Sequence, residues 1–110
     1  MGYYTDVNAN LTFTPELDSL SAFLAVKEIG YPWSDITSRG IRFNDNGKFY
    51  GIDDEVKRLI EAVKAHTTVS GTIIGVGEEQ PDIWRIVIKD NVATREEAQI
   101  VWPDGSPADI

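Results

Sequence analysis

Hydrophobic and polar side chains alternate from Tyr3 to Phe13, which predicts a long β-strand with one buried face. Thr14 and Pro15 follow as an expected N-cap and first helical residue. Beyond them, leucines recur at spacings of three and four, and this predicts an amphipathic helix that ends before Gly30.

The middle of the chain predicts a hairpin followed by a second helix. Residues 36–43 form the first expected strand, and residues 44–47 form a turn because Asn and Gly tolerate positive φ. Residues 48–50 return as a short strand. Residues 53–66 have the apolar stripe and the charge distribution of a helix, with acids at its start and Lys and His at its end.

The pattern of apolar residues in the last third of the chain predicts a meander of three strands. These strands span residues 69–76, 83–89 and 92–102. An acidic turn over 77–82 and a two-residue turn at 90–91 connect them.

The element order β-α-β-β-α-β-β-β predicts an α+β fold. We expect a largely antiparallel sheet of about six strands, with two helices packed on one face. Residues 1–103 would form a single domain, and residues 104–110 a loose C-terminal tail. The residues expected in the core, together with the Tyr3 face of the first strand, are Leu17, Leu20, Leu24, Leu59, Ile60, Val63, Trp84, Ile86 and Ile88.

The charge of the chain is strongly acidic. Ten Lys and Arg oppose 18 Asp and Glu among 110 residues, a net charge of −8. Residues 53–110 contribute twelve acids and six bases, a net of −6. Non-specific binding to phosphate backbones and to anionic membranes is therefore disfavoured, since both need a basic face. Two interpretations remain open: a solvated acidic surface, or a surface for a basic partner.

The sequence offers no complete metal site. It has no cysteine and one histidine, His66, so a zinc site lacks ligands. Treating 44–47 as part of a calcium loop would put the cation Arg42 at the first ligand position and Asp53 at the last, where glutamate is needed. We expect no metal and no cofactor.

Reaction chemistry is also poorly supported. Gly71, Gly75 and Gly77 match neither the dinucleotide fingerprint nor the phosphate-binding loop, and glycines inside a strand more often mark bulges or close packing. Ser70 and His66 lie outside any known nucleophile context. An enzyme is therefore the least supported class of function.

The residues that could bind a partner lie in turns and at strand ends. Glu78, Glu79 and Asp82 crowd the turn over 77–82, and Glu96 and Glu97 lie on the neighbouring strand, pointing to opposite faces. A solvated hairpin tip also explains the turn and is favoured over the third interpretation, Mg²⁺ binding. The aromatic side chains of Tyr31 and Trp33 flank Pro32 in a loop, where they would either contact a partner or cover the core.

Five segments resemble a known group of proteins. They are Met1-Gly2-Tyr3-Tyr4-Thr5, Ser70-Gly71-Thr72-Ile73, Gly77-Glu78, Asp82-Ile83-Trp84-Arg85-Ile86 and Ile100-Val101-Trp102-Pro103. Together they resemble small proteins of unknown function from actinobacteria and their phages. The resemblance implies a cytoplasmic protein, located in the host cell cytoplasm if a phage encodes it. It carries no catalytic residue over to this chain.

These observations favour a small, acidic, non-enzymatic binding protein. We expect a phage accessory or anti-defence protein that occupies the surface of a host protein, with carboxylates placed where a nucleic-acid-binding partner expects phosphates. No direct contact with nucleic acid or membrane is expected. The alternative is a small-ligand binding module that uses the open face of the sheet. Binding through acids would weaken steeply with salt, whereas binding in an apolar pocket would not.

Overall fold

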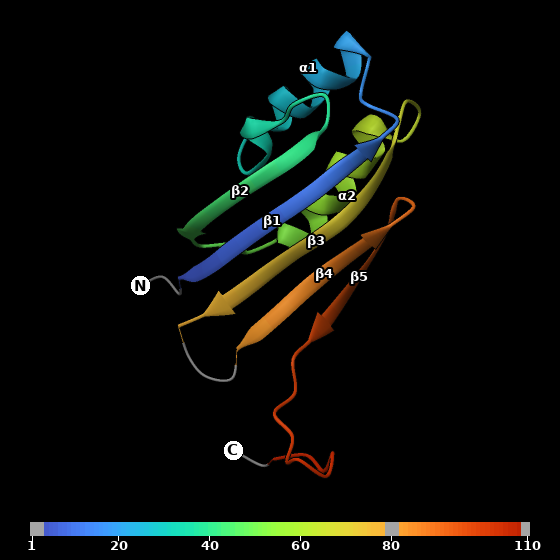
Figure 1. The fold of residues 1–110 in the computed structure, drawn as a ribbon. Coiled ribbons are helices and arrows are strands. Elements are labelled where there is room, and N and C mark those ends of the chain that lie inside the picture. The colour runs from blue at the N-terminus through green and yellow to red at the C-terminus, as the bar shows by residue number, and fades with distance from the viewer. Residues whose placement is uncertain (1–3, 79–81, 109–110) are drawn as a thin grey trace.

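The computed structural model describes residues 4–78 and 82–108. These residues form one five-stranded antiparallel sheet with two α-helices (Figure 1). The strand order is β2-β1-β3-β4-β5, and every neighbouring pair is antiparallel. In chain order the elements are β1 (Thr5–Thr14), α1 (Leu20–Ile29), the 3₁₀ helix η1 (Trp33–Asp35), β2 (Gly40–Gly47), α2 (Ile52–Val63), β3 (Thr68–Gly77), β4 (Ile83–Lys89) and β5 (Val92–Glu97). The predicted α+β class is confirmed.

The sheet has five strands instead of about six because the expected hairpin at 44–47 is absent. β2 continues through these residues and pairs with β1, with Asn44 opposite Asn8 and Gly47 opposite Thr5. Residues 48–50 add no strand to the sheet. β1 is ten residues long and offers β2 a partner along its length. Cross-strand pairing therefore outweighs the local turn preference of Asn and Gly.

Both helices contribute to a core on one side of the sheet. α2 lies behind the sheet in Figure 1 and buries Val56, Leu59 and Val63 completely. α1 packs against α2 and η1. The opposite side of the sheet carries no helix in this view, so one face remains open. None of the helices in the two described ranges is long and apolar enough to cross a membrane.

The first helix begins later than predicted, which changes the face it buries. β1 runs to Thr14, and α1 begins after Ser19, whose Oγ accepts a hydrogen bond from the Ala22 amide at 3.3 Å. The buried helix residues are Ala22 and Val26, whereas Leu20 and Leu24 are 75% and 58% exposed. The prediction that these two leucines lie in the core is wrong. The other seven expected core residues, including Leu17 before the helix, are buried.

The last strand is shorter than predicted and lies outside the core. β5 ends at Glu97 instead of Trp102, and all six of its residues are exposed. Ala98 still donates its amide to the Ile83 carbonyl at 2.8 Å, but β4 begins at Ile83 and offers no further partner. Residues 98–108, here called the C-terminal arm, therefore leave the sheet and extend beyond it (Figure 1). The domain boundary placed at 103/104 stays a prediction.

Candidate functional site

The open face of the sheet divides into a polar half and an apolar half. Strand register places Asn44, Asn8, Ile74, Arg85 and Glu96 in one row across all five strands. Their sequence neighbours point to the other face, where the core lies. β2 and β1 thus supply mainly amide side chains to this surface. β3 and β4 supply its aliphatic side chains, which are Ile74, Val76, Ile83 and Val87, beside the polar Ser70, Thr72, Arg85 and Lys89.

The apolar half contains an exposed strip made by Ile74, Val76 and Ile83, here called the apolar strip. These side chains are 43%, 42% and 38% exposed. Val76 lies directly opposite Ile83, and Ile74 is the next residue of β3 on the same face. A hollow of about 380 Å³ lies beside them, lined by Ile74, Ile83 and Ala98 together with Arg85 and Glu96. Antiparallel sheets usually place polar residues on a solvated face, so this strip departs from the ordinary pattern.

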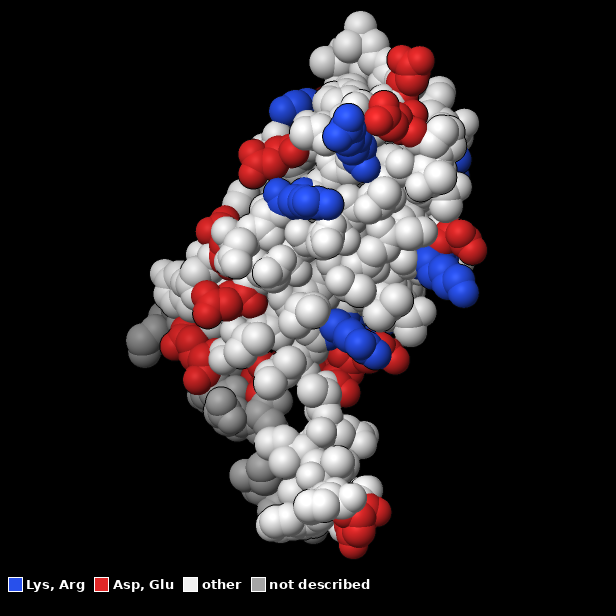
Figure 2. Space-filling model, viewed as in Figure 1, with Lys and Arg blue, Asp and Glu red and all other residues white. Residues whose placement is uncertain are grey.

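Carboxylates border the apolar strip at the end where β3 finishes and β4 starts. The Glu78 carboxylate accepts a hydrogen bond from the Tyr4 amide. The Asp82 carbonyl accepts a 2.7 Å bond from the Gly77 amide, which closes the hairpin. Figure 2 shows acidic side chains gathered towards this end of the open face. Glu79 was predicted to share this site and lies outside the described residues.

Glu96 and Glu97 point to opposite faces of β5 and pair with different arginines, although both residues line the hollow beside the apolar strip. Arg85 Nε donates to Glu96 Oε1 at 2.7 Å on the open face, beside the apolar strip. Arg95 Nε donates to Glu97 Oε1 at 3.1 Å on the face that carries the core. Burial opposes the charge on Arg95, but its hydrogen bonds to Glu97 and Asp53 outweigh this effect and raise the Arg95 pKa.

The aromatic loop is divided between the core and the surface. Trp33 is fully buried, and its Nε1 donates to the Glu55 carbonyl at 3.2 Å. The prediction that Trp33 contacts a partner is therefore corrected: the ring fills the core between α2 and β2, where it meets Phe43 edge-on. Tyr31 is 58% exposed and donates its hydroxyl to Asp45 Oδ2 at 2.6 Å. Partial burial and this hydrogen bond to a carboxylate raise the pKa of Tyr31 to about 12.

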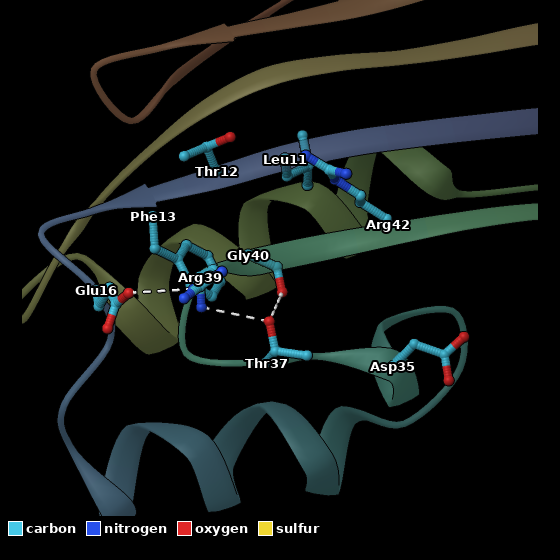
Figure 3. A pocket seen from close by; sticks show the side chains of 9 residues that line it. All are labelled: Leu11, Thr12, Phe13, Glu16, Asp35, Thr37, Arg39, Gly40 and Arg42. Carbon is cyan, nitrogen blue, oxygen red and sulfur yellow. Dashed lines mark hydrogen bonds and ion pairs between the residues drawn. The ribbon is translucent and has the colours of Figure 1, made fainter.

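Another hollow, of about 590 Å³, lies at the other end of β1 and β2 (Figure 3). Its polar groups bind one another: Arg39 pairs with Glu16 at 3.4 Å, and Thr37 Oγ1 donates to the Gly40 carbonyl at 3.2 Å. Asp35 points away from these residues in Figure 3. The hydroxyls of the described lining belong to Thr12 and Thr37. Thr37 donates to a backbone carbonyl and not to Glu16 or Asp35, so it is not paired with a carboxylate base in this geometry.

The other chemical candidates are explained by local structure. His66 is exposed and its Nε2 lies 3.5 Å from Ser19 Oγ, whereas Ser70 Oγ accepts a 3.4 Å bond from the Asp90 amide. Gly75 lies beneath the Trp84 ring, where close packing needs a residue without a side chain. Across residues 4–78 and 82–108, no three His, Asp or Glu side chains form a group that could hold a metal ion.

Sequence reasoning missed the exposed apolar residues of the C-terminal arm. Trp102 is 60% exposed, and Ile100 and Val101 are also exposed. The arm is held by its own backbone bonds: the Trp102 amide donates to the Ser106 carbonyl, and the Ala108 amide to the Ile100 carbonyl, both at 2.8 Å. The proline and glycine residues after Trp102 were the available signal that this apolar segment turns back on itself instead of continuing a strand.

Comparison with known proteins gives a family but no function. No curated protein and no protein of known structure matches the chain. A family model matches residues 6–110, which extends from β1 through the C-terminal arm. The chain therefore belongs to the family of unknown function DUF6205.

Proposed function

We propose that this protein is a non-enzymatic binding module that docks onto another protein through the open face of its sheet. The docking surface comprises the apolar strip with Glu78, Asp82 and Glu96 at its border. The observation that carries the proposal is the exposed apolar strip on the open face, with Glu78 and Asp82 at its hairpin end and the Arg85–Glu96 ion pair beside it. Protein interfaces commonly combine an apolar centre with a polar rim.

The apolar strip supports protein binding because its exposure has no structural benefit to the isolated chain. Ile74, Val76 and Ile83 point away from the core. A partner that covered them would remove apolar surface from water, at about 25 cal/mol per Å². The arm leaves the sheet at Ala98, beside Ile83, and carries the exposed side chain of Trp102 as a second apolar feature.

The charge around the apolar strip favours a basic partner. The half of the chain that carries it, residues 53–110, has a net charge of −6. A matching surface would have an apolar centre bordered by Lys and Arg, as on proteins that bind nucleic acid. The resemblance to small proteins of actinobacteria and their phages supports a host protein as this partner and, if a phage encodes the chain, an anti-defence role in the host cytoplasm.

Two pairs of matched variants test the proposal. Val76→Thr changes the apolar strip, and Val92→Thr makes the same change at the opposite end of the open face, where Val92 is 65% exposed. Glu78→Ser with Asp82→Ser removes two acids from the docking surface. Glu16→Ser with Asp18→Ser removes the same two residue types beyond the other end of β1.

Tagged wild-type and variant proteins would capture partners from an extract of the source organism, and mass spectrometry would quantify them. The binding kinetics of each variant would then be measured with the purified partner. We expect Val76→Thr to weaken binding of the captured partner about fivefold, equivalent to about 1 kcal/mol. The acidic double variant should slow association and flatten its salt dependence. Equal binding by Val76→Thr and Val92→Thr would contradict the proposed surface.

A further inference from the structure

Amide side chains cluster on the polar half of the open face. Register places Asn8 opposite Asn44 and Asn10 opposite Arg42, and these four residues line a shallow hollow of about 330 Å³. We call these four residues the amide patch. The patch lies on β1 and β2, separate from the apolar strip on β3 and β4.

The polar groups of the amide patch are open to a ligand. In the next row, Asn46 Nδ2 donates to Asp6 Oδ1 at 2.6 Å, so that pair satisfies itself. Within the part of the chain that the structure describes, the side chains of Asn8, Asn10 and Asn44 make no hydrogen bond to the protein. Each amide presents a carbonyl acceptor next to two N–H donors.

The positions of these asparagines oppose the preference of the backbone. Asn and Asp are depleted in strands, yet they occupy three successive open-face positions of β1, an interior strand, at Asp6, Asn8 and Asn10. Thr12 and Thr72 show that the same face accepts a strand-forming polar residue. Solubility alone would be equally served by threonine. Residues that oppose the secondary-structure preference at several neighbouring positions are expected at functional sites, where binding and not folding determines the residue type.

The charge around the patch restricts the class of ligand. Arg42 provides one cation within the patch, Asp6 one anion in the next row, and Lys48 a second cation beside Tyr4. A phosphorylated ligand over the patch itself would meet one arginine on an acidic protein, and a metal ion would meet one carboxylate. A neutral ligand rich in hydroxyl groups fits better, because each hydroxyl both donates and accepts, as each amide does.

An aromatic ring at the edge of this region strengthens the assignment. Tyr4 lies two residues before Asp6 on the same face and is 46% exposed. Lys48 Nζ lies 5.6 Å from the centre of its ring. Sugar rings combine hydroxyl groups with an apolar C–H face, which packs on aromatic rings. Amides on adjacent strands are about 5 Å apart, and amides two residues apart on one strand are about 7 Å apart. The patch could therefore contact several hydroxyl groups of one saccharide at once.

We propose that the amide patch binds a neutral saccharide lying across β1 and β2. This proposal does not depend on the docking surface.

The test begins with the full chain on an array of neutral, sialylated and phosphorylated glycans. The best-binding neutral oligosaccharide is then titrated into ¹⁵N-labelled protein, whose Asn side-chain NH₂ resonances report directly on the patch. We expect binding to neutral glycans, with shifts at Asn8, Asn10 and Asn44.

Asn8→Thr with Asn44→Thr should reduce this affinity at least tenfold while keeping or raising the melting temperature, since threonine favours strands. Thr94→Ala, on β5 and the same face, is the control and should bind as the wild type does. Val76→Thr should also bind normally, which separates this site from the docking surface. Failure to bind any neutral glycan, preference for acidic or phosphorylated glycans, or unchanged affinity in the double asparagine variant would each overturn the proposal.

Discussion

The guanidinium carbon of Arg95 lies 4.7 Å from the centre of the Trp84 ring, on the face of the sheet that carries the core. The same guanidinium donates to Asp53 Oδ1 at 3.1 Å in the first turn of α2. Arg95 is thus the residue through which the exposed strand β5 contacts both the ring of β4 and the covering helix. Its contacts close the edge of the core where no apolar residue of β5 is buried.

Replacing Arg95 with alanine should lower the free energy of unfolding by about 1 kcal/mol. The cation–π contact and the partly exposed ion pairs each contribute a fraction of that amount. Arg85→Ala is the matched control, because Arg85 also pairs with a glutamate but lies on the open face. The Arg85→Ala substitution should lower the free energy of unfolding by less than about 0.5 kcal/mol. Urea unfolding of both variants measures the difference, and equal losses would show that Arg95 has no special role.

A methyl group at Gly75 should destabilise the fold by about 3 kcal/mol. A Cβ atom there would lie 2.2 Å from two atoms of the Trp84 ring, so strand or ring must move. Gly47→Ala is the control, since its Cβ would meet Phe49 and Tyr31 only at 3.5 Å. Adding Trp84→Leu to Gly75→Ala should recover part of the loss in thermal unfolding. A Gly75→Ala protein as stable as Gly47→Ala would contradict this packing.

Tyr31 should ionise near pH 12, later than an ordinary tyrosine with a pKa of 10.0. Partial burial and the hydrogen bond to Asp45 both favour the protonated phenol. Because the folded-state pKa is raised, the resulting stabilisation is fully present below pH 10 and is lost as the pH rises towards 12. Ultraviolet titration at the phenolate band, with Tyr31→Phe subtracted, should isolate this transition. Asp45→Asn should move it to lower pH, and an unmoved transition would exclude Asp45 as a cause.

The outer face of α1 should tolerate polar substitution. Leu24→Ser changes a side chain that is 58% exposed, and should alter the free energy of unfolding by no more than about 0.5 kcal/mol. Val26→Ala, two residues later, removes fully buried methyl groups and should cost about 2 kcal/mol. Chemical denaturation would distinguish the two. A large loss at Leu24 with a small one at Val26 would restore the helix orientation predicted from sequence.

The hydrophobic pattern correctly predicted the buried faces of regular elements. The alternation from Tyr3 to Phe13 anticipated the buried face of β1, and the stripe of α2 was correct at Leu59, Ile60 and Val63. The predictions failed where pairing with residues distant in sequence determines the local structure. The segment 44–47 has turn chemistry, but β1 supplies it with strand partners almost forty residues away. Ser19 replaces Thr14 as the helix cap because β1 continues through Thr14 to meet Thr68.

The candidate site was less predictable than the fold. Glu78, Asp82 and Glu96 were identified from charge alone, but the apolar strip beside them depends on which face of β3 and β4 is covered. The asparagines at 8, 10 and 44 appeared to be ordinary polar positions of an alternating strand or of a turn. Only the register between β1 and β2 brings them together. Trp33 could not be separated from Tyr31 in sequence, since both flank the same proline.

The strand order also has a consequence for how the protein is made. β1 leaves the ribosome first, yet it is an interior strand whose two neighbours begin at Gly40 and Thr68. Its pairing with β2 needs the chain only as far as Gly47, whereas its pairing with β3 joins Thr5 to Gly77 and needs most of the chain. β3, β4 and β5 are joined by short connections and can assemble as they emerge. One edge of β1 therefore stays without a partner until β3 has been synthesised, and an unpaired strand edge is a site where a partly made chain can aggregate.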